Sequence, residues 1–239
     1  MKLKIAYFFS ILSILIFLLF FSQKRNTNKK KLKVDIDFKH ENGKFLDSQM
    51  VNKLLIQSED STFYLVKDTL DLNVLEDLLI SNPMIANADV FRTPQGILKV
   101  KLEERSPVIR VINNHEQFYI DKYGYRVPLS KKYSARVPIF YGKLNSNITD
   151  LINFIELIKI DSLTKFEIID MRVINDNYVL GVRSFPFKIL WGKNTKYRHK
   201  LKKLKYLYSY LGGLDSVKIQ NVNLVFDKQI VLDYGQNGK

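Results

Sequence analysis

The sequence predicts an α+β protein made of an N-terminal transmembrane helix, a small module with the order strand-helix-helix-strand-strand, and a mixed β-sheet domain with two helices. Three observations lead to this prediction. An apolar run without charge lies near the N-terminus. Short stretches alternate apolar and polar residues, as half-buried strands do. Longer stretches repeat apolar residues every three or four positions, as amphipathic helices do.

Residues 5–22 are predicted to span a membrane. The run IAYFFSILSILIFLLFF, residues 5–21, carries no charge, and as a helix it is about 26 Å long, close to a hydrocarbon core of about 30 Å. Lys4 and Lys24 flank it and can reach the headgroups. A cleaved signal peptide is the alternative, but its apolar part is usually about 7 to 15 residues long and precedes a small-x-small site, which SQKRN lacks. We therefore expect an uncleaved anchor.

Positive charge is concentrated beside this anchor. The formal net charge is +14, and residues 1–33 contain eight basic side chains and no acidic one. Such a collar favours anionic lipid headgroups, whereas nucleic-acid binding needs basic charge on a folded face with aromatic residues between. We expect lipid contact through the anchor and collar, and no nucleic-acid partner. The collar consists of Lys2, Lys4, Lys24, Arg25, Lys29, Lys30, Lys31 and Lys33.

The flanking charges leave the topology open. Residues 1–4 are predicted to form a short tail and residues 23–33 a basic tether. Because more basic residues follow the anchor than precede it, the positive-inside rule would keep the folded part in the cytoplasm, but a long domain can translocate regardless of such charge. The chain has no cysteine, which excludes disulfides and thiolate sites without locating the compartment.

Residues 34–104 are predicted to form the first module. The stretch VDIDF alternates apolar and acidic residues, which predicts a strand. Asp47-Ser48 can cap one helix, and Asp71 can cap a second helix that ends before Pro83. Two strands then fold back on each other around Pro94-Gln95-Gly96. The predicted elements are a strand at 34–38, a helix around 50–55, a helix at 73–79, a strand at 85–91 and a strand at 96–104.

Residues 105–239 are predicted to form a β-rich, partner-binding domain. Short apolar and aromatic stretches are separated by Gly, Pro and Asn-Asp turns, which predicts many short strands. Its main elements are a helix at 149–160, a strand at 166–174, a helix at 194–211, and a final hairpin at 217–226 and 228–234.

The helix at 194–211 is strongly basic. Apolar and aromatic residues recur along it at steps of four, three, four and three, so this stripe is predicted to face the core. The cationic residues are then predicted to be a solvent-exposed face. The stripe consists of Tyr197, Leu201, Leu204, Tyr208 and Leu211, and the cationic face of Lys196, Arg198, Lys200, Lys202, Lys203 and Lys205.

Four segments, in order along the chain, have the pattern of one protein family. NPMIANADV at 82–90 is similar to a Pro-x-Val-x-x-Ala-x-Val run, and KLEERSPV at 101–108 to a Val-Glu-Arg-x-Pro-Val junction. YIDKYG at 119–124 is similar to Tyr-Leu-Val-Asp-x-x-Gly, and RVPIFYG at 136–142 to Leu-Pro-hydrophobic-x-Gly. The chain thus resembles the bacterial cell-division family FtsQ/DivIB.

This resemblance implies both a fold and a location. The first module is expected to be of the POTRA type. The chain is expected to be a single-pass type II protein of the cytoplasmic (inner) membrane, with residues 1–4 in the cytoplasm. The bulk of the chain then lies outside this membrane, in the periplasm where there is one.

The sequence contains no recognised catalytic or metal-binding motif. The patterns GxSxG, HExxH, GxGxxG, Walker A and EF-hand are absent. His40, His115 and His199 are scattered, and the side chains of Glu103 and Glu104, neighbours on one strand, point to opposite faces. We therefore expect no enzymatic activity, no catalytic residue, no cofactor, no metal and no small-molecule substrate.

Open sheet edges are the expected binding sites, because their unpaired N–H and C=O groups can accept another chain as a strand. The last hairpin is the first candidate, and the resemblance implies that small single-pass division proteins of the FtsB and FtsL type dock there. The alternative is that its apolar residues pack inward and the C-terminal tail covers the edge. The strand at 85–91 is a weaker candidate. The candidate residues are Val222, Asn223, Leu224, Val225, Phe226, Lys228 and Ile230 in the hairpin, and Ile85, Asn87 and Asp89 in the other strand.

The predicted function is that of a non-enzymatic divisome scaffold, which recruits or links cell-division proteins for septum formation through its extracytoplasmic domains. One alternative is a periplasmic POTRA chaperone, or a secretion or envelope-assembly subunit, that binds extended polypeptides. The other is a membrane-tethered cell-wall enzyme, which would need a cleft with convergent ionisable groups.

Overall fold

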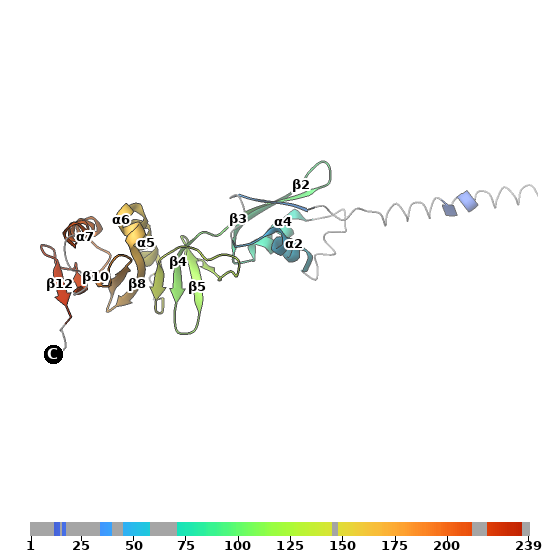
Figure 1. Ribbon diagram of the computed structural model, residues 1–239. Coiled ribbons are helices and arrows are strands. Elements are labelled where there is room, and N and C mark those ends of the chain that lie inside the picture. The colour runs from blue at the N-terminus through green and yellow to red at the C-terminus, as the bar shows by residue number, and fades with distance from the viewer. Residues whose placement is uncertain are drawn as a thin grey trace, which may run out of the picture.

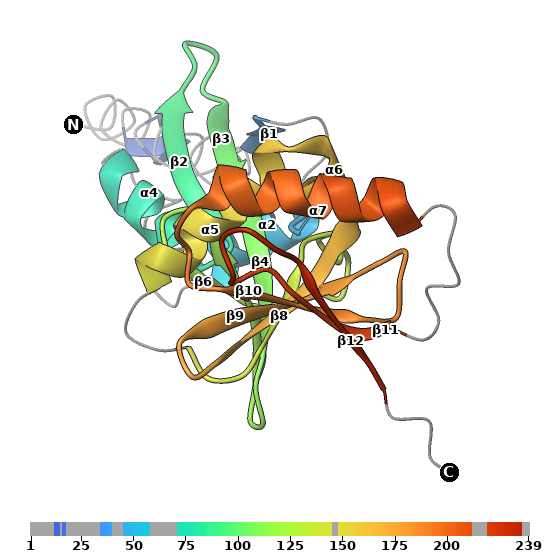
Figure 2. The same cartoon turned by 90° about the vertical axis from the view of Figure 1, so that its left-hand side faces the viewer.

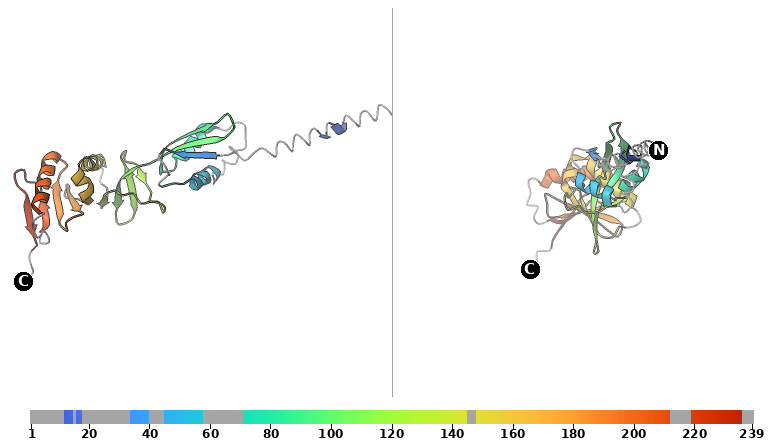
Figure 3. Two further views of the ribbon diagram at one scale, coloured as in Figure 1. Left: turned by 45° about the horizontal axis from the view of Figure 1, so that its top comes forward. Right: turned by 90° about the vertical axis from the view of Figure 1, so that its right-hand side faces the viewer.

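The structure, a computed structural model, describes residues 12–14, 16–17, 34–39, 45–57, 71–144, 148–211 and 219–235. The predicted anchor and tether therefore lie outside the described residues, apart from 12–14 and 16–17, which are helical. No helix within the described ranges is long and apolar enough to cross a membrane. Two folded parts follow each other in line, and β12 lies at the end of the second part that faces away from the first (Figures 1 and 3).

The first part has the predicted order of strand, helix, helix, strand and strand. Its three-stranded sheet has the order β1-β3-β2, in which β1 runs parallel to β3 and β2 antiparallel to it. Each edge of this small sheet is therefore formed by one strand with a single neighbour. The elements are β1 (Val34–Phe38), α2 (Ser48–Gln57), α4 (Leu72–Ile80), β2 (Ile85–Arg92) and β3 (Leu98–Glu104).

Alternation along the strands explains the core of this first part. Val90 and Val100 are buried together with Leu75 and Leu79 of α4, so apolar residues of the sheet pack against the helices. The residues between them carry charge on the opposite face, where Lys39 Nζ lies 2.8 Å from Glu103. One face of the sheet is thus apolar and covered, and the other is charged.

The second part contains a single nine-stranded mixed sheet. Its strand order is β12-β11-β10-β9-β8-β7-β4-β5-β6, so the outermost strands are β12 and the two-residue β6. The strands are β4 (Pro107–Ile112), β5 (Gln117–Asp121), β6 (Arg126–Val127), β7 (Ile139–Tyr141), β8 (Ile168–Ile174), β9 (Asn177–Val182), β10 (Lys188–Gly192), β11 (Ile219–Asn223) and β12 (Val231–Tyr234).

Three helices, not the predicted two, lie on one face of this sheet: α5 (Ile148–Ile160), α6 (Ser162–Glu167) and α7 (Tyr197–Leu211) (Figure 2). The short α6 replaces the start of the strand predicted at 166–174. It begins where the Asp161 carboxylate accepts hydrogen bonds from the backbone N–H groups of Leu163 and Thr164. An N-cap aspartate thus sets the start of a helix within a stretch of strand-forming residues.

The prediction of a fully solvated cationic face on α7 is wrong for two residues. Lys200 and Lys203 are buried, with 5% and 8% of their surface exposed. Each lies four positions before a buried leucine, Lys200 before Leu204 and Lys203 before Leu207, so they occupy the same helical face as these core residues. Tyr208, which the stripe placed inward, is only partly buried. The buried face of α7 therefore differs from the predicted stripe and includes two of its lysines.

The two parts meet through a small aromatic cluster. Phe45, just before α2, is 3% exposed and packs edge-on against Tyr119 and Tyr133. The backbone on either side is also bonded, because Ser130 Oγ donates to Phe45 O at 3.1 Å and Lys132 Nζ donates to Leu46 O at 3.0 Å. These contacts join the first part to residues that lie far along the chain in the second.

Candidate functional site

The nine-stranded sheet ends in β12, which has only one neighbour. β12 pairs antiparallel with β11, with Asn223 opposite Val231 and Val222 opposite Leu232. Its other edge faces away from the sheet, at the end of the folded part (Figures 1 and 2). Among the described residues, no side chain forms a hydrogen bond to the backbone of Val231–Tyr234, and β11 is the one strand that pairs with it.

The predicted edge residues lie mostly one strand further in. Val222 and Asn223 belong to β11, which lies between β10 and β12, and Val222 and Leu224 are fully buried. Leu224 is also held to β10, because its N–H donates to Leu190 O at 3.0 Å. Placing the open edge at Val222–Phe226 was therefore wrong. The edge is the second strand of the same hairpin, because β11 arrives parallel to β10 through α7 and leaves β12 outside.

The remaining candidates of the hairpin lie in the loop before β12. Val225 and Phe226 are exposed by 44% and 49%, Lys228 is exposed, and Ile230 is partly buried against the core. Along the edge itself, Val231 and Tyr234 are exposed by 37% and 56%. Apolar and aromatic side chains therefore gather beside open backbone groups, a combination that suits the addition of a partner strand.

The loop before β12 is held by basic side chains of α7 and by Lys196, the residue before this helix. Lys203 Nζ donates to the carbonyl oxygens of Leu224 and Phe226, each at 2.6 Å. The next residue of the loop is Asp227. Its carboxylate lies 2.5 Å from Lys196 Nζ, and its carbonyl oxygen accepts a hydrogen bond from His199 Nε2 at 2.5 Å. We call this set of contacts the α7 clamp.

Burial and neighbouring charges shift the pKa values of two groups in the α7 clamp, Lys203 and Asp227. Burial lowers the pKa of Lys203, and the nearby Asp227 carboxylate partly opposes this effect. The hydrogen bond and charge of Lys196 lower the pKa of Asp227. The α7 clamp is therefore an ionic contact at its exposed end and a buried ammonium bonded to carbonyl groups at its inner end.

The second candidate edge, β2, is at the edge of its sheet as expected, but it is already engaged. Ile85 is fully buried, whereas Asn87 and Asp89 are exposed. The N–H of Val90 donates to the carboxylate of Glu76, on α4, at 2.7 Å. A side chain of the covering helix thus occupies a backbone donor that an incoming strand would need.

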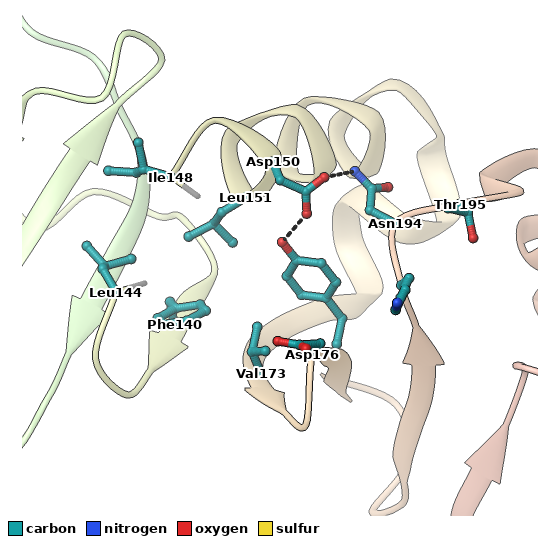
Figure 4. A pocket seen from close by; sticks show the side chains of 11 residues that line it. Phe140, Leu144, Ile148, Asp150, Leu151, Val173, Asp176, Asn194 and Thr195 are labelled. Carbon is teal, nitrogen blue, oxygen red and sulfur yellow. Dashed lines mark hydrogen bonds between the residues drawn. The ribbon is translucent and has the colours of Figure 1, made fainter. Parts of the chain in front are cut away.

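A pocket of about 390 Å³ lies where α5, the β8–β9 turn and the β10–α7 loop meet (Figure 4). The Asp150 carboxylate accepts a hydrogen bond from Tyr178 Oη at 2.8 Å and a longer one from Asn194 Nδ2 at 3.3 Å. Burial, followed by the bond to Asp150, raises the pKa of Tyr178. The phenol therefore stays protonated, and these polar groups bond to one another instead of forming an activated nucleophile and base.

The part of the chain that the structure describes contains no cluster of metal-ligating side chains. No three His, Asp or Glu side chains there lie close enough to hold a metal ion. His115 and His199 are exposed and lie on different elements, β4–β5 turn and α7 respectively.

Comparison with known families decides what this geometry belongs to. The model of the family described as FtsQ/DivIB, C-terminal related, matches residues 106–232, which is more than half of the chain and runs from β4 into β12. The chain belongs to the FtsQ/DivIB family. This family consists of non-enzymatic, membrane-associated proteins with a role in cell division. A search of curated proteins finds no match.

The sequence reasoning missed three residues of the FtsQ/DivIB candidate edges: Tyr234, Lys203 and Glu76. A signal existed for the first, since Tyr234 belongs to the stretch predicted as the second strand of the last hairpin. For Lys203 the signal is weak, since it is the neighbour of Leu204, a residue of the predicted inward stripe. For Glu76 no sequence signal exists, because its bond to Val90 depends on how α4 packs against β2.

Proposed function

We propose that this FtsQ/DivIB protein is a non-enzymatic scaffold of the divisome. Residues 5–22 anchor it in the cytoplasmic membrane with the N-terminus inside, and the folded parts lie in the periplasm. There it recruits and links division proteins. Family membership supports a role in division, and the basic collar supports contact with anionic lipid beside the anchor.

The observation that carries this proposal is the open edge of β12. A nine-stranded sheet ends in a four-residue strand that has one neighbour and whose backbone is bonded to no described side chain. A partner segment in extended conformation completes the ladder there by backbone hydrogen bonds. Its alternate side chains then lie beside Val231, Tyr234 and the exposed Phe226, which sets which sequences fit.

The partners we propose are single-pass division proteins of the FtsB and FtsL type. Such proteins share the same membrane, so their extracytoplasmic segments reach the folded part of this chain at high local concentration. The chaperone alternative places the binding activity in the first module, and its edge β2 is less suited to it because Glu76 occupies the Val90 donor.

Site-specific photo-crosslinking in dividing cells tests the proposal. A photoreactive phenylalanine analogue replaces Tyr234 on β12 or, as a matched control, Tyr141 on β7, which is an exposed tyrosine (43%) inside the same sheet. We expect an adduct with a single-pass division protein from position 234 and none from position 141. In parallel, depletion of the protein should give filamentous cells.

Three outcomes contradict this function. Adducts of equal yield at both positions mean that β12 is not the docking strand. An adduct only with a second copy of the chain makes the edge a self-association site. An envelope-assembly defect with normal septa on depletion supports the chaperone alternative instead.

A further inference from the structure

The α7 clamp suggests a role for a residue that does not itself lie on the edge. We propose that Lys203 is a positioning residue of the docking edge: its buried ammonium fixes the loop from which β12 starts, so that β12 is held in register before a partner arrives. This inference rests on the proposed docking function for its purpose, but the positioning itself is independent of any partner.

The first step is that Lys203 is buried, and its ammonium donates to the carbonyl oxygens of Leu224 and Phe226, at 2.6 Å each. No carboxylate of the described residues lies at hydrogen-bonding distance from it. A buried ammonium is stable only where its donors are bonded, and charged donors make strong bonds to carbonyl groups. The position of Lys203 on α7 and the position of the loop backbone are therefore mutually dependent.

The second step is that the loop is fixed on both sides of this contact. Before it, Leu224 N–H donates to Leu190 O of β10. After it, Asp227 is bonded through its carboxylate to Lys196 and through its carbonyl to His199. Carbonyl groups at residues 224, 226 and 227 are thus all bonded to α7 residues, although the loop itself contains no regular structure.

The third step is that β12 depends on this loop more than an inner strand would. It has four residues and pairs on one side only, and it begins four residues after Asp227. The pairing with β11 contains an irregularity between Ile219 and Asn221. The register is therefore weakly specified at the end of β12 that contains Tyr234. The loop end, held by Lys203, is left to specify it.

Hydrogen exchange on the full chain in membrane-mimicking discs, without any partner, tests the positioning. In Lys203→Met the aliphatic stem remains and the ammonium is lost. We expect the protection of the β12 amides (Val231–Tyr234) to fall at least tenfold, with the β4 and β5 amides unchanged. Lys203→Arg should restore part of the protection, and the matched control Lys202→Met, on the exposed face one residue earlier, should leave it unchanged.

A pH profile separates positioning from simple packing. Because burial lowers the pKa of Lys203, the β12 protection of the wild type should decline at a pH below the ordinary lysine pKa of about 10.4. Lys203→Met should lack this decline. Unchanged β12 exchange in Lys203→Met overturns the inference, as does equal loosening of β4 and β5. Loosening of β12 together with undiminished crosslinking at position 234 would retain the positioning role and overturn docking at β12.

Discussion

Each folded part has an edge strand that was a candidate for docking, β2 in the first and β12 in the second. The two strands differ in whether a helix side chain bonds to their backbone. In the first part, β2 has eight residues, yet the Glu76 carboxylate of α4 accepts a hydrogen bond from the Val90 N–H. In the second part, β12 has four residues whose backbone is bonded to no described side chain. Edges are commonly blocked by such side chains, so a strand like β12, which has none among the described residues, is a candidate for pairing with another chain.

The covering helices account for this difference. α4 contributes a carboxylate that reaches the backbone of the edge strand itself, whereas α7 contributes ammonium groups that reach only the loop before β12. In the first case a helix side chain competes with an incoming strand for a donor. In the second case it fixes the strand and leaves its outward groups open. In both parts a helix side chain thus bonds to backbone groups. In the first part these groups belong to the edge strand, and in the second they belong to the loop before it.

The largest effect is expected where the two parts meet, because this contact holds β2 and β12 in a fixed arrangement. Phe45→Ala removes a ring that is 3% exposed and packed against Tyr119 and Tyr133, which typically costs about 3 to 5 kcal/mol. We expect the two parts to lose their fixed orientation. Since the chain has no cysteine, spin labels on Asp77→Cys and Arg172→Cys report one distance, whose distribution should broaden in Phe45→Ala.

Tyr123→Ala is the control for this experiment, because Tyr123 is an aromatic residue of the same folded part as Tyr119 but is 70% exposed. Its distance distribution should match that of the wild type. A broad distribution in the wild type itself would mean that the two edges move independently.

A smaller effect tests the closed edge directly. Glu76→Ala leaves the Val90 N–H without its charged acceptor, and losing a hydrogen bond to a charged group costs about 1.5 to 3 kcal/mol. Because this bond is only part-buried, we expect a value near the lower limit, together with faster exchange of the Val90 amide and concentration-dependent self-association through β2. Urea unfolding, hydrogen exchange and sedimentation measure these three quantities.

Asp77→Ala is the matched control, since Asp77 is the next residue on α4 and is exposed. It should change none of the three. If Glu76→Ala behaved in the same way as Asp77→Ala, the contrast between the two edges would lose its basis in side-chain blocking.

The order of elements could be predicted from the sequence because it depends on local patterns. Alternation in VDIDF and the caps at Asp47 and Asp71 act within a few residues. The small helix α6 was missed because its cap, Asp161, precedes residues that also suit a strand. Local signals conflict there, and tertiary packing decides.

The identity of the open edge could not be predicted, because it depends on which strands become neighbours. Val222 and Val231 belong to strands of similar pattern, and only the parallel pairing of β11 with β10 makes the former inner and the latter outer. Burial of Lys203 has the same origin: its head is bonded by carbonyl groups that the loop brings to it. Polar groups satisfied across the fold leave little trace in a single sequence.

The smallest expected effect concerns pH and two tyrosines of the second part, the buried Tyr178 and the partly buried Tyr208. Burial raises the pKa values of Tyr178 and Tyr208 in the second part, and bonds to Asp150 and Glu167 add to this. The unfolded chain loses these protons above a pH of about 10, whereas the folded chain keeps them. Their contribution to stability is therefore complete below that pH and is lost as the pH rises above it, by at most about 1.4 kcal/mol per pH unit for each group.

The variant Tyr178→Phe isolates this term. It forgoes the bond to Asp150, so it should be about 1 kcal/mol less stable at neutral pH, but its stability should fall less steeply above pH 10. Lysines with lowered pKa values, Lys200 and Lys203, act in the opposite direction and remain in both proteins, so the difference between the two curves reports the tyrosine alone. Urea unfolding at several pH values from about 8 to 11 measures it. Parallel curves for the two proteins would show that Tyr178 ionises equally in the folded and unfolded chains, and that its hydroxyl is not held by Asp150.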